Sequence, residues 1–261
     1  MARSRDPRHH ARMNYDGTPR LPPPPPLSGQ SALFLDVDGT LVAFADHPEG
    51  VSVAPPVVDR LVEVADMLDG ALALVSGRRI ETLDALFAPH RFAAAGLHGL
   101  QRRRAGEDVP PPEQPPVALQ AVKMQARTLL NRYPDALLED KGEAMALHWR
   151  LMPEAAADLQ SFAMQALTRL PGYHLQPGRD VVELRPSHGD KGAAIAAFMD
   201  EPPFLERTPV FVGDDLTDEH GFEIVNARGG VSVLVGDRTG SAAEHRLADI
   251  AAVYAWLGAQ A

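Results

Sequence analysis

Four short runs that are apolar, apart from one serine at position 232, constrain the fold of this chain more than any other feature. They lie at residues 32–35, 71–75, 209–212 and 231–235. Between the first two runs, apolar residues recur at helical spacing over residues 57–68. Strands that are apolar on both faces and alternate with amphipathic helices predict a parallel sheet covered by helices on both faces. We therefore expect an α/β chain with a Rossmann-like core.

Residues 104–186 have a different pattern, which predicts a smaller α+β unit. Its expected elements are, in chain order, a helix at about 117–132, strands near 136–140 and 144–150, a helix at about 153–169, and strands near 173–177 and 180–184. This order is compact enough for a cap (lid) domain inserted into a catalytic core of residues 31–103 and 187–261. The alternative is that the segment simply continues the core.

The first 30 residues mix scattered arginines with a run of five prolines at residues 22–26. Such a run favours an extended polyproline conformation over packing. Residues 1–30 are therefore predicted to be a disordered leader without a catalytic role.

Composition excludes several classes of function. A formal net charge of −10 argues against broad nucleic-acid binding, which needs a basic surface. No apolar run approaches the roughly 20 residues that span a membrane, and the basic N-terminus lacks the hydrophobic stretch of a secretory signal. The chain has no cysteine, which fits a reducing cytoplasm. We expect a cytoplasmic protein; its oligomeric state is not indicated.

The motif DVDGT follows the first apolar run directly and places Asp36 and Asp38 at the end of a buried strand. Ligands of open α/β sheets bind there, and strand positions two apart face the same way. The Asp36 carboxylate can attack phosphorus to form an aspartyl-phosphate, and a Mg²⁺ ion would offset the repulsion between the two anions. Asp38 can then protonate the leaving alkoxide and activate water. The alternative is ordinary Asp-Gly turn chemistry.

A second acidic motif, GDDLTDE at residues 213–219, follows the third apolar run. Asp214 at the strand end is the candidate metal ligand. Asp218 can join it in support, and Asp215 lies beside them in the sequence. Acids are also favoured in the first turn of a helix, which explains Asp218 but not an acid directly at a strand end.

Two further positions suit a phosphate group. Ser76, with Gly77 and Arg78, offers a hydroxyl near the N-terminus of a helix. Lys191 offers a point charge at another helix start. Taken singly, Ser76 is as well explained as a helix N-cap, and Lys191 as a solvated surface charge.

The order of these four motifs along the chain resembles that of the haloacid dehalogenase-like phosphatases. The resemblance covers residues 31 to about 258. It implies that Asp36 is the nucleophile and Asp38 the acid/base, and that Ser76, Gly77 and Lys191 hold phosphate. It also implies a Mg²⁺ site with ligands from Asp36, Asp38 (through its backbone carbonyl), Asp214 and, in support, Asp218.

Residues of the predicted cap restrict the resemblance to one group within these phosphatases. Glu139, Lys141, Arg150, Arg179 and Glu183 look like the sugar-binding lid of trehalose-6-phosphate phosphatases, and by strand alternation Arg179 and Glu183 share a face. Arg179 stands where that family more usually has lysine, which is not an equivalent donor.

Two other segments also resemble bacterial members of that family. One is residues 212–219. The other is residues 96–99, which places His98 in a loop near the cleft.

The resemblance implies an enzyme that hydrolyses the phosphate ester of a disaccharide, trehalose 6-phosphate, as the last step of trehalose biosynthesis. The nearest alternative is a phosphatase for sucrose phosphate or a glycosyl phosphoglycerate. A phosphomutase fits less well, because Asp38 favours hydrolysis. A non-catalytic sugar-phosphate sensor, or a partner of the synthase, would be expected to lack one of the catalytic acids, and this sequence retains them all.

Overall fold

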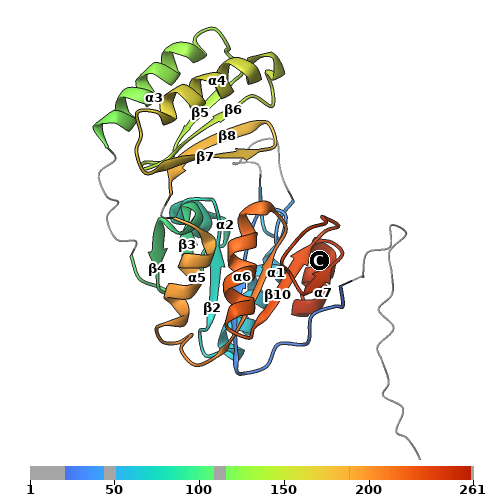
Figure 1. Cartoon of the computed structure of the whole chain (residues 1–261). Coiled ribbons are helices and arrows are strands. Elements are labelled where there is room, and N and C mark those ends of the chain that lie inside the picture. Colours follow the sequence, from blue (N-terminus) through green and yellow to red (C-terminus); the bar gives the residue numbers. More distant parts are fainter. Residues whose placement is uncertain (1–20, 44–50, 109–115, 188, 260–261) are drawn as a thin grey trace, which may run out of the picture.

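The computed structural model describes residues 21–43, 51–108, 116–187 and 189–259. Residues 1–20 of the predicted leader lie outside the described residues. The described chain forms two units, a larger one with a seven-stranded sheet and a smaller one with a four-stranded sheet (Figure 1).

The larger sheet has the order β11-β10-β9-β1-β2-β3-β4. Its strands are β1 (Ser31–Leu35), β2 (Leu72–Val75), β3 (Ala93–Gly96), β4 (Gln101–Arg103), β9 (Thr208–Gly213), β10 (Val231–Val235) and β11 (His245–Leu247). All neighbouring pairs are parallel except β3 and β4. The chain proceeds from β1 toward β4 on one side, and from β9 toward β11 on the other. The strand order therefore reverses between β1 and β9, where open α/β sheets bind ligands.

Helices cover both faces of this sheet, as predicted. They are α1 (Pro55–Met67), α2 (Ile80–Leu86), α5 (Lys191–Met199), α6 (Glu219–Ala227) and α7 (Ile250–Leu257). α5 contacts α6, and α1 contacts α7. One hydrophobic cluster runs through the sheet and these helices, with the strand residues of β1 fully buried. Among the described residues, no helix has the length and apolar character needed to cross a membrane.

The smaller unit is an antiparallel sheet of order β5-β6-β8-β7, backed by two helices. Its elements are α3 (Val117–Leu130), β5 (Leu137–Asp140), β6 (Met145–His148), α4 (Ala156–Leu167), β7 (Tyr173–Gly178) and β8 (Val181–Pro186). It has a hydrophobic cluster of its own, between the helices and one face of the sheet. This separation supports the proposed division into a core and an inserted cap.

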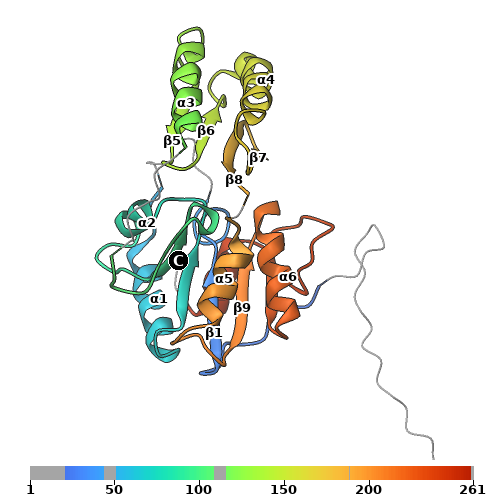
Figure 2. The ribbon, with the colours of Figure 1, turned by 60° about the vertical axis from the view of Figure 1, so that its left-hand side comes forward.

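The cap lies above the carboxyl ends of the core strands, with α3 and α4 on its outer side (Figure 2). Along β5, Leu138 packs in the cap cluster, so its neighbour Glu139 faces the opposite way. Glu139, Ala146, Glu183 and Gln176 form one cross-strand row. The polar face of the cap sheet is therefore turned to the core.

The prediction that strand alternation places Arg179 and Glu183 on one face is wrong. Gly178 pairs with Val181, which leaves Arg179 and Asp180 as the two-residue turn between β7 and β8. Asp180 has φ of 59°, the left-handed conformation that such tight hairpin turns use. Strand alternation therefore does not relate Arg179 to Glu183.

Residues 21–30 also differ from the prediction of a disordered leader. The backbone carbonyls of Pro22 and Pro25 accept hydrogen bonds from Arg246 N and Trp256 Nε1. Leu27 packs against the main cluster. A polyproline segment has no internal hydrogen bonds, so its carbonyls are free to accept bonds from a neighbouring surface.

Candidate active site

Asp36 is the first residue after β1, at the point where the strand order reverses. Its N–H donates to Val212 O of β9 at 2.9 Å, which fixes it between the two strands. The residue is only 3% exposed. Burial raises its pKa well above the ordinary value, while Lys191 opposes that rise. The ionised form that a nucleophile needs therefore depends on nearby positive charge.

Lys191 supplies that charge. It is the first residue of α5, whose start is fixed by Asp190 accepting from Ala193 N at 2.7 Å. Its Nζ lies 2.8 Å from Asp36 Oδ1 and 2.7 Å from Asp218 Oδ1. Burial alone would lower the pKa of Lys191, but the two carboxylates raise it above the ordinary value. The alternative of a solvated surface lysine is thus wrong.

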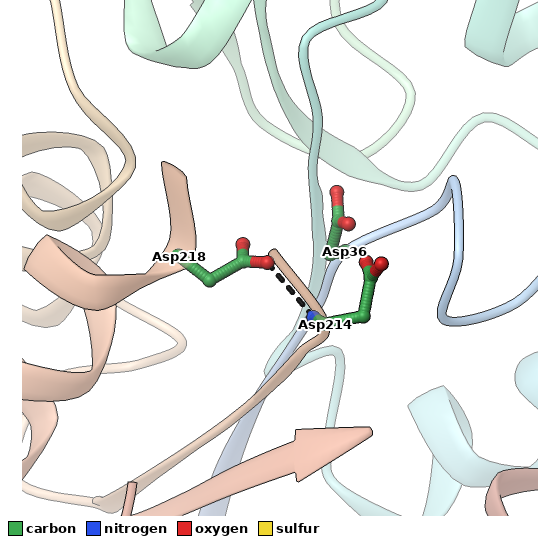
Figure 3. A group of neighbouring side chains, drawn as sticks. All are labelled: Asp36, Asp214 and Asp218. Atoms are coloured by element: carbon green, nitrogen blue, oxygen red, sulfur yellow. Dashed lines mark hydrogen bonds between the residues drawn. The ribbon is translucent and has the colours of Figure 1, made fainter. Parts of the chain in front are cut away.

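Asp218 organises the loop after β9. Its Oδ2 accepts from the N–H of Asp214 at 2.9 Å (Figure 3). The same oxygen accepts from the N–H of Asp215 at 3.0 Å, and Oδ1 accepts from Lys191 Nζ at 2.7 Å. Asp215 in turn accepts from Thr217 N at 2.7 Å. These bonds form a capping box that starts the short 3₁₀ turn Leu216–Asp218. Asp218 therefore holds both the acidic loop and the lysine in place.

The carboxylates of Asp36, Asp214 and Asp218 offer oxygen atoms that all lie within 4.8 Å of one another. Among the described residues, Asp214 Oδ1 is buried without a partner. Burial first, and then Asp218 and Asp215, raise the pKa of Asp214 to about 7. An added divalent cation would relieve this accumulation of buried negative charge, and oxygen ligands suit Mg²⁺. The residues present therefore fit such an ion.

Gly39 makes room for this arrangement. It has φ of 84°, and a Cβ atom there would lie 2.1 Å from Asp214 Oδ2. Any side chain at position 39 would displace the acid from the neighbouring strand end.

The Asp38 side chain does not belong to this acidic group. Arg78 holds it instead, with Nε at 2.8 Å from Oδ2 and Nη2 at 2.6 Å from Oδ1. This bidentate hydrogen bonding fixes the orientation of the Asp38 carboxylate. Arg78 is thereby placed in the site next to the predicted acid/base.

Ser76 is fully buried at the end of β2, and its Oγ accepts from Arg78 N at 3.1 Å. It does not cap the helix that follows, because α2 begins only at Ile80, with Arg79 as the N-cap. Gly77 has no room for a side chain, since a Cβ atom would lie 2.6 Å from His98 Nε2. The Ser76–Gly77 turn is therefore shaped by packing against His98.

His98 connects this turn to the cap. It lies in the 3₁₀ segment Leu97–Gly99 with φ of 56°, and its N–H donates to Ser76 O at 2.9 Å. Its Nε2 is 3.8 Å from Glu183 Oε2 of β8. Burial lowers the pKa of His98 to about 4, so the ring is neutral near pH 7. This contact brings the cap face against the turn that we expect to hold phosphate.

Three of the predicted cap residues form one charged cluster on the polar face of the cap sheet. Lys141 Nζ lies 3.1 Å from Glu183 Oε2 and 3.9 Å from Glu139 Oε2. Burial by itself would raise the pKa of Glu183, but Lys141 and His98 lower it to about 2. His148, which the family resemblance did not assign, also joins the cluster, 3.0 Å from Glu139.

The other two predicted cap residues lie elsewhere on the sheet. Arg150 follows β6, with its Nε 3.9 Å from Asp180 Oδ2, and Arg179 is exposed in the turn beside it. Both are at the end of the sheet where β7 turns into β8. Arg150 and Arg179 are thus separate from the Glu139–Lys141–Glu183 cluster.

One residue of the site went undetected in the sequence. Arg238 donates to Asp215 O at 3.1 Å and pairs with Glu219, so it supports the acidic loop from the β10 side. Arg238 lies 23 residues after Asp215 in the sequence, and no sequence motif around it indicates a role in the site.

Comparison with known proteins agrees with this geometry. A family model described as trehalose-phosphatase matches residues 34–251, which is most of the chain. The chain belongs to the trehalose-phosphatase family. It is therefore a phosphatase, with the haloacid dehalogenase-like fold of its relatives.

Two relatives show the extent of this match. The trehalose-6-phosphate phosphatase of Escherichia coli (strain K12) is 45% identical over 89% of this chain and 87% of its own. A probable trehalose-phosphate phosphatase of Sinorhizobium fredii is 41% identical over 78% of this chain and 77% of its own.

Solved structures of lower identity share the fold of this phosphatase. The C-terminal domain of Candida albicans trehalose-6-phosphate phosphatase superposes with a TM-score of 0.73 at 18% identity, covering 89% of this chain and 93% of that one. The C-terminal domain of the Candida albicans trehalose synthase regulatory protein superposes with a TM-score of 0.63 at 15% identity, covering 89% and 94%. Since the fold also occurs in a protein described as regulatory, catalysis has to be argued from the site residues.

Proposed function

We propose that this enzyme hydrolyses trehalose 6-phosphate to trehalose and inorganic phosphate, with Mg²⁺ as cofactor and Asp36 as nucleophile. The observation that carries the proposal is the buried group of Asp36, Lys191 and Asp214 beneath a cap face rich in carboxylates and cations.

In the first step the Asp36 carboxylate attacks phosphorus, an aspartyl-phosphate forms, and the sugar alkoxide leaves. Lys191 opposes the rise that burial causes in the pKa of Asp36, and its Nζ, 2.8 Å from Asp36 Oδ1, lies where it can hold a phosphate oxygen. Asp38, oriented by Arg78, gives a proton to the alkoxide. In the second step Asp38 takes a proton from water, which attacks the phosphoryl group and frees Asp36.

Asp36 and Asp214, together with the backbone carbonyl of Asp38, are the groups we assign to Mg²⁺, with Asp218 in support. A bound Mg²⁺ supplies charge neutralisation between the nucleophile and the phosphate. Asp218 contributes by fixing the Asp214 backbone and Lys191, since both of its oxygens already accept hydrogen bonds.

The proposed sugar substrate rests on the family and on the cap. Glu139 and Glu183 offer acceptors for sugar hydroxyl groups, and Lys141 offers donors. The two named relatives act, by their descriptions, on trehalose phosphate. A phosphatase for sucrose phosphate or a glycosyl phosphoglycerate remains the second candidate, since it would use the same core.

The deciding experiment is phosphate release from trehalose 6-phosphate with Mg²⁺ and with EDTA, beside glucose 6-phosphate and sucrose 6-phosphate. We expect rapid release from the trehalose ester only, lost on chelation and restored by added Mg²⁺. Release from sucrose 6-phosphate instead would leave the mechanism standing and replace the substrate. Undiminished release in EDTA would contradict the metal assignment.

Removing one cap carboxylate should separate sugar recognition from chemistry. In Glu139→Gln, we expect kcat/KM for trehalose 6-phosphate to fall about 10- to 100-fold, because a charged hydrogen-bond partner of a hydroxyl is lost. Hydrolysis of p-nitrophenyl phosphate, which has no sugar, should change little.

Glu154→Gln provides the matched control. It makes the same chemical change, but Glu154 is exposed in the turn before α4, away from the polar face of the cap sheet. It should leave both substrates unaffected. Equal losses on the two substrates in Glu139→Gln would rule out a role for the cap in choosing the sugar.

A further inference from the structure

The burial of residues 21–27, Leu-Pro-Pro-Pro-Pro-Pro-Leu, has a period of three. Leu21 and Leu27 are half-buried and Pro24 is buried, whereas the four other prolines are exposed. A polyproline II helix has three residues per turn, so positions three apart form one ridge. The burial period is the one expected of a polyproline II helix that places its Leu21–Pro24–Leu27 ridge against the protein.

The surface beneath it is built by α7 and β11. Trp256 Nε1 of α7 donates to Pro25 O at 3.0 Å, and Arg246 N of β11 donates to Pro22 O at 2.9 Å. Leu27 and Trp256 both pack against the main hydrophobic cluster. Figure 1 shows the segment in dark blue, passing beside α7. Aromatic-lined grooves recognise proline-rich peptides in this way, because the polyproline helix is preformed and its carbonyls are free.

The segment also covers an exposed sheet edge. β11 is the last strand of the seven-stranded sheet, and unpaired N–H groups on such an edge can pair with another chain. Pro22 accepts from the Arg246 N–H, but the five prolines have no N–H to offer a further strand. The run therefore ends the sheet instead of extending it.

We propose that residues 21–27, packed on β11 and α7 around Trp256, protect the edge of the core sheet. The docked segment blocks pairing of β11 with the edge of a second copy. This inference is independent of the proposed substrate and mechanism, since it involves none of the site residues.

The test uses the full-length chain with two neighbouring substitutions. Pro24→Asp puts a carboxylate on the buried ridge, where burial is unfavourable. Pro23→Asp makes the same change one residue away, on the exposed side. Hydrogen exchange at the Arg246 amide and the Trp256 indole reports on docking, and light scattering at rising protein concentration reports on association.

In Pro24→Asp, we expect exchange at Arg246 to rise about tenfold, the order expected when one backbone hydrogen bond is lost. Association should appear in this variant only, with Pro23→Asp matching the wild type. Trp256→Phe keeps an aromatic side chain but removes the indole N–H donor and part of the ring surface, so it should also speed exchange at Arg246. Equal exchange in the two proline variants would contradict docking through the buried face of Pro24. Release of the segment without association would overturn its blocking role.

Discussion

Asp36→Asn should abolish phosphate release, with a fall in kcat of at least about 10⁴-fold for every ester, as is found when an enzyme loses its nucleophile. The amide has nearly the shape of the carboxylate but cannot attack phosphorus. Acid-quenched wild-type enzyme should carry a phosphoryl group on the peptide that contains Asp36, and the variant should carry none. Mass spectrometry of the quenched protein measures this directly.

Folding should not account for that loss. Burial, and then Asp218, Asp214 and Asp215, raise the pKa of Asp36 by more than Lys191 lowers it, so a neutral amide removes a charge whose burial is unfavourable even with Lys191 beside it. We therefore expect the Tm of Asp36→Asn to match or exceed that of the wild type. Asp59→Asn, an exposed position in α1, is the matched control and should retain full activity. Turnover by Asp36→Asn near the wild-type rate would exclude Asp36 as nucleophile.

Lys191→Met should produce the second-largest loss. It leaves Asp36 and Asp218 without their shared cation, and removing one partner of a buried ion pair costs about 3–5 kcal/mol in the free energy of unfolding. It also removes a phosphate contact, for which we expect kcat to fall about 10²- to 10³-fold. Steady-state kinetics with the sugar ester and with p-nitrophenyl phosphate, together with thermal unfolding, measure the two effects.

Lys123→Met is the control that separates the loss of stability from the loss of phosphate binding. Lys123 is as fully buried as Lys191, but it lies in the cap, where it pairs with Asp140 and Gly142 O. Its loss should destabilise the cap and leave hydrolysis of p-nitrophenyl phosphate near the wild-type rate. If the two lysine variants lost aryl phosphatase activity equally, the role of Lys191 would be structural only.

In the core sheet, the strands that the sequence predicted are those with apolar runs, namely β1, β2, β9 and β10. It did not predict β3, β4 and β11, because these have three or four residues each, with sequences such as Ala-Ala-Ala-Gly and His-Arg-Leu that carry no clear periodicity. Such short strands form because their neighbours in the sheet pair with them. That information is absent from the local sequence.

The site shows the same division between local and distant information. Asp36, Asp214 and Ser76 follow apolar strands, and Lys191 begins a helix, so their convergence could be predicted from the parallel sheet. The contact of Arg78 with Asp38 joins residues 40 apart, and that of Lys191 with Asp218 joins residues 27 apart. These pairings depend on loop conformations that no local motif specifies.

The separate hydrophobic cluster of the cap has a consequence for how such enzymes diversify. The groups that we propose for breaking the phosphate ester all lie in the core. Glu139, Lys141 and Glu183 instead lie on the polar face of the cap sheet, which packs its hydrophobic cluster on the other face. Substitutions on the polar face of the cap sheet can therefore change which sugar is bound without disturbing the hydrophobic cluster of the core or that of the cap. A lineage could acquire a new sugar ester by altering a few side chains while inheriting the hydrolytic step unchanged.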